Sequence, residues 1–207
     1  MQLSNTSHAV MSQRFEPSGS LDDFPTPPWA TRALLEYVLK PIELKKYSCW
    51  EPACGRGYMS ETLKEYFESV CASDVFDYGY GDSSVLDFLK NDRTLKTDWM
   101  VTNPPFKHAE DFIVKGLDTS NVGVAVLVRT VFLESIGRYK RLFSVNPPSF
   151  VAQFSERVPM VRGRIDPNAS TATGYAWMVW NKQSNSDTRV VWIPPCKAIL
   201  SKASDFR

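Results

Sequence analysis

The stretch of residues 47–74 reads YSCWEPACGRGYMSETLKEYFESVCASD, and it decides the fold. Its first seven residues are mostly apolar and predict a strand that stops at the glycine-containing turn CGRG. The next ten, Tyr58–Phe67, predict a helix because Met59, Leu63 and Phe67 recur at helical spacing. The segment SVCASDVF then predicts a second strand that ends at an acid. A strand, a helix and a strand in this order predict a right-handed βαβ unit with parallel strands.

The same alternation continues on both sides of this unit. We expect helices at 31–40, at 84–92 after a turn, and at 108–117, and strands at 98–102 and 122–133. Near the end, FVAQFSERVPMV and YAWMVWNK predict two strands joined without a helix, which implies an antiparallel hairpin at the sheet edge. The sequence therefore predicts an α/β fold, a single domain over residues 21–207 with a seven-stranded, mostly parallel sheet. The polar residues 1–20 predict a disordered or loosely docked tail.

Composition excludes several classes of protein. With 207 residues, 43% hydrophobic and 23% charged, the chain suits one globular domain. No apolar run reaches the roughly 20 residues of a membrane span, and the N-terminus lacks the apolar core of a secretory signal. We therefore expect a cytoplasmic protein with no membrane partner. The four cysteines form no CxxC pair and the chain has two histidines, so no metal site is predicted and the thiols are expected to be buried and reduced.

The loop Glu51-Pro52-Ala53-Cys54-Gly55-Arg56-Gly57 lies where a strand ends and a helix begins, and open α/β sheets bind ligands at such points. Gly55 and Gly57 allow positive φ and a close approach of a ligand to the backbone. Asp74 ends the next strand, 23 residues after Glu51, at a spacing that suits a carboxylate bound to two ribose hydroxyls. The loop has neither the third glycine of a dinucleotide fingerprint nor the Gly-Lys-Ser/Thr of a P-loop. It therefore predicts a site for a nucleoside without phosphates.

Asp87 and Phe88 follow Asp74 after one further βα step. A carboxylate in this position can accept a hydrogen bond from an adenine amino group, while the aromatic ring covers a face of the base. The alternative for Asp87 is an acid at a helix N-terminus, where the helix dipole stabilises it.

Asn103-Pro104-Pro105-Phe106 follows the strand at 98–102 and carries the chemistry. Two prolines cannot continue a central strand, so they form a rigid corner that turns the preceding acceptor groups outward. An exocyclic amine is a poor nucleophile because its lone pair is delocalised into the ring. The Asn103 side-chain oxygen and the Pro104 carbonyl can hold both N–H protons and direct the lone pair at a methyl group, while Phe106 stacks on the base. These four residues are the predicted catalytic set for methyl transfer to an exocyclic nitrogen.

These motifs resemble the amino-group methyltransferases of nucleic acids, in particular the DNA adenine-N6 family and its small phage- or prophage-encoded members. Asn103 to Phe106 match that family's D/N-P-P-Y/F motif, and Glu51 to Gly57 resembles its cofactor loop. The segment FPTPPW at 24–29 resembles the cofactor-cradling segment that precedes the loop in some members, and the match spans about residues 24–133. The resemblance implies a Rossmann-like class I methyltransferase domain that binds S-adenosyl-L-methionine and methylates adenine N6 in DNA.

The resemblance also implies the residues that contact the cofactor. They come from the proline-rich segment, the glycine loop, the ends of the following strands and the Asn-Pro-Pro-Phe corner: Thr26, Pro27, Glu51, Pro52, Ala53, Cys54, Gly55, Gly57, Asp74, Val75, Asp87, Phe88 and Asn103.

Charge is unevenly distributed along a chain whose net charge is only +1. Residues 129–164 hold seven basic and two acidic side chains, whereas residues 1–128 hold 12 basic and 18 acidic ones. This polarity favours a polyanion on one side of the molecule, although charges that cluster in sequence need not form one patch. The predicted nucleic-acid contacts are Lys107, Arg129, Arg138, Arg141, Arg162 and Arg164.

Larger members of the family carry a separate target-recognition domain, for which 207 residues leave no room. The candidate substitutes are the loop 107–111, the segment Thr130–Arg141 and the connection Arg162–Gly174. A small number of base contacts discriminates only weakly between sequences. We therefore expect low sequence specificity, or a partner that supplies the specificity.

The implied reaction is direct in-line transfer to a base flipped out of its stack, with no covalent enzyme intermediate and no metal. Three alternatives stay open: adenine in RNA, a protein glutamine amide, and a non-catalytic binding protein that keeps the fold and the cofactor loop. The corner does not separate DNA from RNA because the amine is the same. Phe106 and the basic segment count against the glutamine amide, where an NPPY corner is usual. A monomer and a homodimer are both compatible with the sequence.

Overall fold

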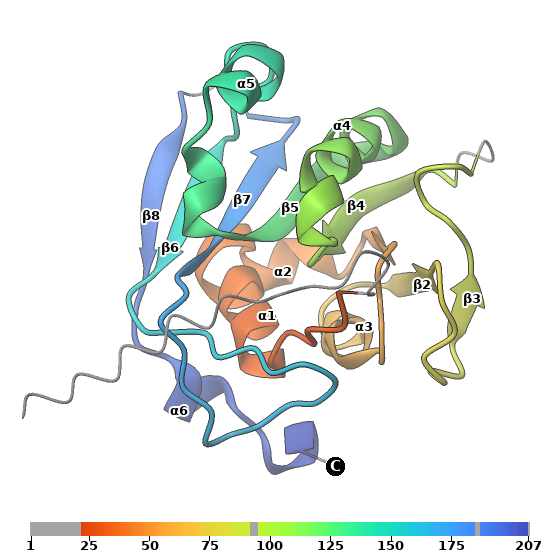
Figure 1. Ribbon diagram of the computed structural model, residues 1–207. Coiled ribbons are helices and arrows are strands. Elements are labelled where there is room, and N and C mark those ends of the chain that lie inside the picture. Colours follow the sequence, from red (N-terminus) through yellow and green to blue (C-terminus); the bar gives the residue numbers. More distant parts are fainter. Residues whose placement is uncertain (1–21, 92–94, 185–186, 207) are drawn as a thin grey trace, which may run out of the picture.

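The computed structural model describes residues 22–91, 95–184 and 187–206, so the predicted tail at 1–20 lies outside the described residues. The strands form one sheet in the order β3-β2-β1-β4-β5-β7-β6-β8 (Figure 1). β3, β2, β1, β4 and β5 pair in parallel, and β7 runs antiparallel to both β5 and β6. Their bounds are β1 Ser48–Glu51, β2 Ser69–Asp74, β3 Ser83–Val85, β4 Thr97–Thr102, β5 Ser120–Arg129, β6 Phe150–Phe154, β7 Tyr175–Asn181 and β8 Arg189–Ile193.

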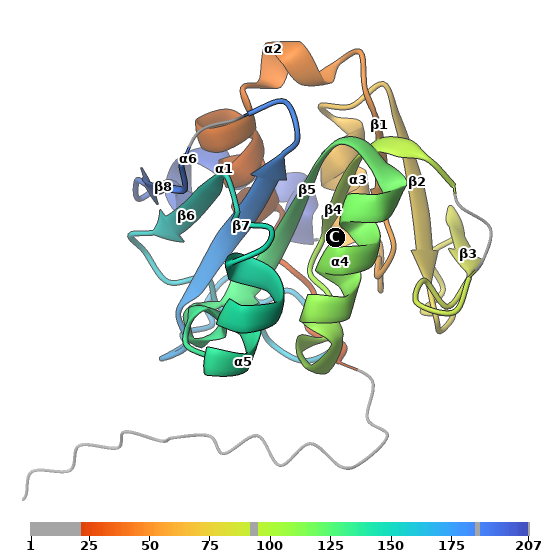
Figure 2. The same ribbon diagram turned by 90° about the horizontal axis from the view of Figure 1, so that it is seen from above.

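Helices cover both faces of the sheet (Figure 2). One face carries α1 (Pro28–Leu34), α3 (Tyr58–Lys64) and α6 (Lys197–Leu200), and the other carries α4 (Ala109–Thr119) and α5 (Ile136–Arg138). α1 continues as a π-helical turn at Leu35–Leu39, and α2 (Pro41–Leu44) follows it; α5 continues likewise at Tyr139–Phe143. Short 3-10 turns occupy Phe106–His108, Thr130–Leu133 and Ala203–Phe206. The expected α/β fold with a mostly parallel, doubly covered sheet is confirmed.

Alternating side chains of the central strands divide the core into two layers. Trp99 and Val101 of β4 pack with the α1 and α3 side, whereas Met100 between them packs with the α4 side. β5 is buried along its length because its apolar run reads VGVAVLV, which suits a strand covered on both faces. The sheet is therefore packed on both faces, and the loops lie at the ends of its strands.

Two sequence predictions about the elements are wrong. The sheet has eight strands rather than seven, because β8 pairs in parallel with β6 and so covers the hairpin that was expected at the edge. Its sequence, RVVWI, is short and β-branched, and only the exposed backbone of β6 gives it a partner. Residues 84–92 do not contain the expected helix in their described part: Ser83–Val85 pairs with β2, and Asp87 then accepts hydrogen bonds from the backbone N–H groups of Leu89 and Lys90 in a turn.

Arg32 on α1 ties together three distant parts of the chain. Its side chain is buried, and it donates to Glu65 after α3 at 2.7 and 3.0 Å, to Asp205 at 2.8 Å twice, and to the Leu200 carbonyl at 2.8 Å. All five N–H donors of the guanidinium thus have acceptors, which is the condition under which a buried charge is tolerated. The network fixes α1, and with it the proline-rich segment before α1.

Replacing Arg32 by Met should lower the free energy of unfolding by about 3–5 kcal/mol, because it leaves the Asp205 carboxylate buried without its partner. Lys202→Met is the matched control: Lys202 pairs with the same Glu65 at 2.7 Å but is half exposed, so its loss should cost less than about 1 kcal/mol. Urea unfolding of both variants measures the difference. Equal losses would contradict a special role for the Arg32 network.

Candidate active site

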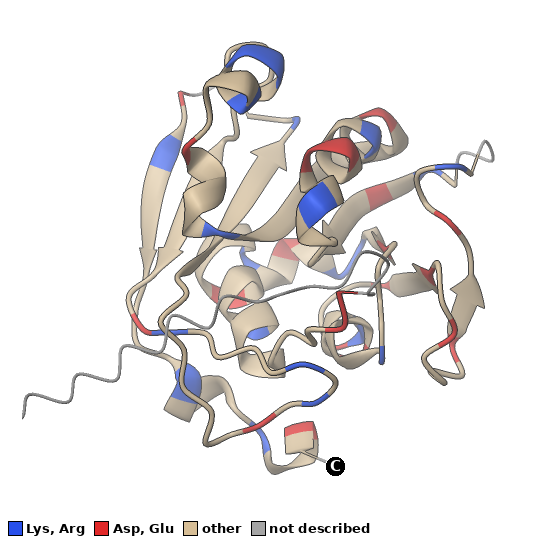
Figure 3. Ribbon diagram, in the orientation of Figure 1, with Lys and Arg blue, Asp and Glu red and all other residues tan. Residues whose placement is uncertain are grey.

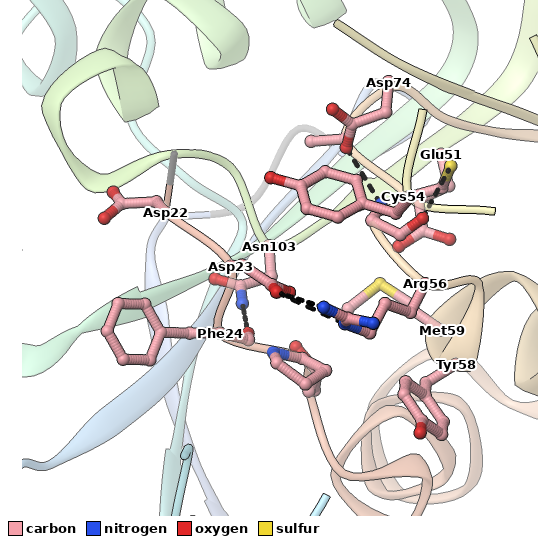
Figure 4. Close-up of a pocket in the computed structure, with 15 residues that line it drawn as sticks. Asp22, Asp23, Phe24, Glu51, Cys54, Arg56, Tyr58, Met59, Asp74 and Asn103 are labelled. Atoms are coloured by element: carbon pink, nitrogen blue, oxygen red, sulfur yellow. Dashed lines mark hydrogen bonds and ion pairs between the residues drawn. The ribbon is translucent and has the colours of Figure 1, made fainter. Parts of the chain in front are cut away.

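The carboxyl ends of β1 and β4 lie side by side at the point where the chain order of the sheet reverses, since β1 leads to β2 on one side and β4 lies on the other. Glu51 ends β1, Asp74 ends β2 and Asn103 follows β4. A pocket opens there, and Figure 4 shows its residues: Asp22, Asp23, Phe24, Pro25, Thr26, Glu51, Ala53, Cys54, Gly55, Arg56, Tyr58, Met59, Asp74, Tyr78 and Asn103. Ligands of open α/β sheets bind at this kind of switch point.

The glycine loop is tied to the end of β2. The Cys54 N–H donates to the Ser73 carbonyl at 3.0 Å, and the Gly55 N–H donates to Asp74 Oδ2 at 2.9 Å. Gly57 precedes α3 with φ +82°, and a Cβ there would collide with the Tyr80 ring. Gly55 has φ +50° and open space where a Cβ would lie. The loop backbone is thus exposed to the pocket at Gly55 and packed at Gly57.

Carboxylates dominate the charge of the pocket. Glu51 is buried, accepts a hydrogen bond from the Ser60 hydroxyl, and has its pKa raised by burial to about 8, with nearby Asp74 adding to the rise. Burial also raises the pKa of Asp74. Asp22 and Asp23 complete the set, and Arg56 neutralises only Asp23, at 2.9 Å. Glu51 is then largely uncharged at neutral pH, and the three aspartates against one base favour a cationic ligand and disfavour phosphates.

Three buried polar atoms in the pocket have no hydrogen-bond partner among the described residues: Asp22 Oδ1, Thr26 Oγ1 in the proline-rich segment, and Asn103 Oδ1. The Asn103 amide is held in one orientation because its Nδ2 donates to the Phe24 carbonyl at 3.0 Å. Buried polar groups are normally paired, so these atoms indicate a ligand that supplies donors.

Aromatic rings surround the other side of the corner. The Phe106 ring lies 6.2 Å from that of Phe24 and 6.4 Å from that of Tyr175 at the start of β7. The Arg129 guanidinium, at the end of β5, lies 3.9 Å from the Phe106 ring centroid, in cation–π contact. One face of the Phe106 ring is thus covered by the Arg129 guanidinium.

The proline-rich segment separates two regions. Figure 4 shows the side chains of Asp22 and Phe24 on one side of it, and that of Asp23, with its partner Arg56, on the other. The Phe24 ring packs against the Phe106 ring. Asp22 Oδ2 accepts a hydrogen bond from the Phe106 N–H at 2.9 Å. We call the first the aromatic side (Asp22, Phe24, Phe106, Arg129, Tyr175) and the second the acidic side (Asp23, Glu51, Arg56, Asp74).

The structure brings about half of the predicted cofactor residues to the pocket. Those that line it are Thr26, Glu51, Ala53, Cys54, Gly55, Asp74 and Asn103, and those that do not are Pro27, Pro52, Gly57, Val75, Asp87 and Phe88. Phe88 cannot cover a ligand ring as predicted: it is 2% exposed, packed in the core with Trp50 and Phe112. The backbone after β3 turns that side chain toward the α4 layer. Asp87 pairs with Lys90 at 3.1 Å instead of facing the pocket.

Sequence reasoning missed several pocket residues. Tyr58 and Tyr78 are aromatic side chains that line the pocket, and no motif marks Tyr78, which lies on the loop after β2. Arg56 lies inside the quoted glycine loop, and Phe24 lies in the quoted proline-rich segment, but neither was assigned a contact. Asp22 and Asp23 precede every motif, so nothing in the local sequence distinguishes them from surface acids.

The predicted nucleic-acid residues do not form one patch (Figure 3). Arg138 donates to the Phe132 carbonyl, and Arg141 forms a two-bond ion pair with Glu110 at 2.7 and 2.9 Å, both beside α4. Arg162 and Arg164 lie in the connection between β6 and β7, where Gly163 N–H donates to the Asp23 carbonyl at 2.8 Å. Lys107, directly after the corner, is exposed. The predicted basic residues therefore lie in separate places, beside α4, after the corner and in the connection between β6 and β7, instead of covering one face.

Three further features of the part of the chain that the structure describes concern metal binding, membrane spans and the loop cysteine. It contains no group of three or more His, Cys, Asp or Glu side chains arranged to hold a metal ion. None of its helices has the length and apolar character to cross a membrane. Burial raises the pKa of the Cys54 thiol to about 12, so the loop cysteine stays protonated and is a poor nucleophile.

Comparison with known proteins shows which solved structures have a similar fold. No family model and no curated protein matches the chain. Solved structures do: the methyltransferase subunit of a type I restriction-modification system from Streptococcus thermophilus is 13% identical with a TM-score of 0.62, over 89% of this chain and 50% of that one. A proposed RNA methyltransferase from Pyrococcus horikoshii is 16% identical with a TM-score of 0.58, over 81% of this chain and 90% of that one.

A third similar structure is the magnesium protoporphyrin IX methyltransferase of Synechocystis with bound S-adenosylmethionine, at 12% identity and a TM-score of 0.51, over 74% of this chain and 79% of that one. The chain spans only half the length of the restriction-modification subunit. The likeness establishes the fold: the chain has the Rossmann-like α/β fold that these methyltransferase structures share.

The pKa of Glu51 gives a stability prediction. The folded-state value of about 8 lies above the ordinary value of 4.5, so the folded protein binds the proton more tightly, and the resulting stability is lost as pH rises from about 4.5 to about 8. Glu51→Gln keeps an acceptor for Ser60 and removes the titration. The variant should gain free energy of unfolding relative to wild type over that range, by a few kcal/mol, since each pKa unit corresponds to about 1.4 kcal/mol. Urea unfolding of both proteins at several pH values measures this; parallel pH dependences would contradict it.

Proposed function

We propose that the protein is an S-adenosylmethionine-dependent methyltransferase that methylates the exocyclic N6 of adenine in DNA. The observation that carries this proposal is the buried, unpartnered Oδ1 of Asn103, held between the acidic side and the aromatic side of the site. A fixed amide oxygen of this kind accepts an N–H, and an exocyclic amine brings one to it. The rigid Pro104-Pro105 corner holds the acceptor in place, so little reorganisation is needed when substrate binds.

The acidic side fits the methyl donor. S-adenosylmethionine, when bound, supplies an electrophilic methyl group on a positively charged sulfur. The carboxylates of Glu51 and Asp74 favour a cation there, and each carboxylate oxygen of Asp74 has a second lone pair for a ribose hydroxyl beside its backbone donor. Thr26 Oγ1 and the open backbone at Gly55 offer further contacts. Tyr78 takes the place that Phe88 was expected to have beside the base of the donor.

The aromatic side fits a flipped base. Phe24, Phe106 and Tyr175 form an apolar wall next to Asn103, and enzymes that modify a base stack it against such side chains. A base that enters would replace the Arg129 guanidinium on the Phe106 ring. Arg129 would then be free to bind a backbone phosphate close to the flipped nucleotide.

The choice of substrate rests on charge and resemblance. Exposed Lys107, Arg162 and Arg164 near the pocket favour a polyanion over a protein glutamine. Solved structures of similar fold include a restriction-modification methyltransferase subunit and a proposed RNA methyltransferase, so adenine in RNA is the second candidate. The order of the motifs, with the proline-rich segment first and the Asn-Pro-Pro-Phe corner last, favours the DNA family.

The direct test offers tritiated S-adenosylmethionine with duplex DNA, single-stranded DNA, total RNA and a protein lysate. We expect label in DNA, recovered as N6-methyladenine after digestion to nucleosides. Asn103→Ala should reduce the rate by at least about 10²-fold, because it removes a preorganised acceptor, and should leave the Kd for the cofactor within a few-fold. Label in RNA alone would move the proposal to the second candidate. Cofactor binding with label in none of the four would leave a non-catalytic binding protein.

Sequence specificity should be low. The segments expected to contact the bases are short loops, and each good base contact supplies only about 1–3 kcal/mol of discrimination. A methylation map of genomic DNA treated with the purified chain should show adenines modified in many short contexts. A strict site of six or more bases would contradict this expectation.

A further inference from the structure

Methyl transfer to an amine leaves one proton too many on the nitrogen. The two acceptors predicted for the amine, the Asn103 amide oxygen and the Pro104 carbonyl, are neutral amide oxygens. They hold an N–H well but are far too weakly basic to keep its proton. A reaction at this corner therefore has to pass the proton to another acceptor, water or a basic side chain within reach, and Asn103, unlike an aspartate in its place, does not bring one.

We propose that Asp22 is that base, a catalytic residue for which the local sequence gives no signal; the inference rests on the proposed function. Asp22 Oδ2 accepts the Phe106 N–H at 2.9 Å, so the carboxylate is anchored to the last residue of the corner. Its other oxygen, Oδ1, is buried and has no hydrogen-bond partner among the described residues. Asp22 lines the same pocket as Asn103, and its neighbour Phe24 holds the Asn103 amide.

The remaining carboxylates of the pocket are placed for other tasks. Asp23 points to the opposite side of the segment and is paired with Arg56 (Figure 4). Glu51 accepts from Ser60, and both oxygens of Asp74 accept backbone N–H groups at the ends of β1 and β2. Among the described acids that line the pocket, Asp22 is the one bonded to the Asn-Pro-Pro-Phe corner on the aromatic side.

The step balances with Asp22 as proton acceptor. The nitrogen lone pair forms the new N–C bond, and the C–S bond breaks with its electron pair staying on sulfur, which changes from a sulfonium to a neutral thioether. The positive charge passes to the nitrogen, and one N–H proton moves to Asp22 Oδ1, leaving a neutral methylamine. The carboxylate also stabilises the positive nitrogen before the proton moves. Product release then returns the proton to water.

A purely structural role for Asp22 is the competing explanation, because its Oδ2 caps the turn at Phe106–His108. Asp22→Asn separates the two roles: the amide oxygen still accepts the Phe106 N–H, while the negative charge and the basic oxygen are lost. Asp22→Ala removes both. Asp118→Asn, on an exposed residue of α4 away from the pocket, is the matched control for the loss of one negative charge.

The experiment measures three quantities for each variant of the full chain: the single-turnover methylation rate at saturating DNA and cofactor, the Kd for S-adenosylmethionine by calorimetry, and the melting temperature. We expect Asp22→Asn and Asp22→Ala to lose about 10²–10⁴-fold in rate, the usual contribution of a positioned proton acceptor. Asp22→Asn should keep the wild-type Kd within about threefold and the wild-type melting temperature. Asp118→Asn should match the wild type in all three.

Three outcomes would overturn the inference. If Asp22→Asn reacts at the wild-type rate and only Asp22→Ala is slow, Asp22 is a cap and not a base. If Asp22→Asn loses cofactor binding or unfolds, its charge serves the cofactor site or the fold. If the wild type methylates none of the four substrates, the proposed function fails, and the inference fails with it; an active wild type with an equally active Asp22→Asn rejects the inference alone.

Discussion

Two hydrogen bonds clamp the proline-rich segment onto the Asn-Pro-Pro-Phe corner, from the Asn103 amide to the Phe24 carbonyl and from the Phe106 N–H to Asp22. They join residues 79 and 84 positions apart, so they close a long loop that contains β1, β2, β3 and β4. The clamp orients Asn103 Oδ1, separates the acidic side from the aromatic side, and brings Asp22 to the corner. Because α1 starts directly after the segment, the Arg32 network that anchors α1 also anchors the clamp. The geometry of the site therefore depends on a contact between the chain's C-terminal helices and its first one.

The two sides of the clamp differ in electrostatic character, because three acids and Arg56 lie on the acidic side whereas one acid, Asp22, and one base, Arg129, lie on the aromatic side. The acidic side holds Glu51, whose burial raises its pKa to about 8, so this acid is largely protonated at neutral pH. A cation entering there would favour ionisation of Glu51, because opposite charges stabilise each other in a buried site. The aromatic side opens between basic residues, Arg129 within it and Lys107 beside it. In the proposed reaction, this arrangement would keep a polyanion from the acidic side and leave the corner to an uncharged base.

Arg129 is a basic side chain within the aromatic side, in contact with Phe106. It lies on the Phe106 ring, and its Nε is buried without a hydrogen-bond partner among the described residues. The ring contact is weak, on the order of 0.5–2 kcal/mol. In the proposed reaction, a stacked base and a nearby phosphate would together displace the guanidinium from the ring.

The amino-acid sequence by itself determined the alternation of strands and helices, the place of the glycine loop and the position of the corner, because apolar periodicity, glycine and proline act over a few residues. It also placed Glu51, Asp74 and Asn103 at strand ends, which in a parallel sheet meet at one edge. The tertiary structure alone decided which side chains face the pocket. Phe88 lies in the core whereas Tyr78 lines the pocket, β8 pairs with β6, and Asp22 contacts the corner across 84 residues. Each of these depends on strand register or on a contact between distant segments, and neither leaves a local pattern in the chain.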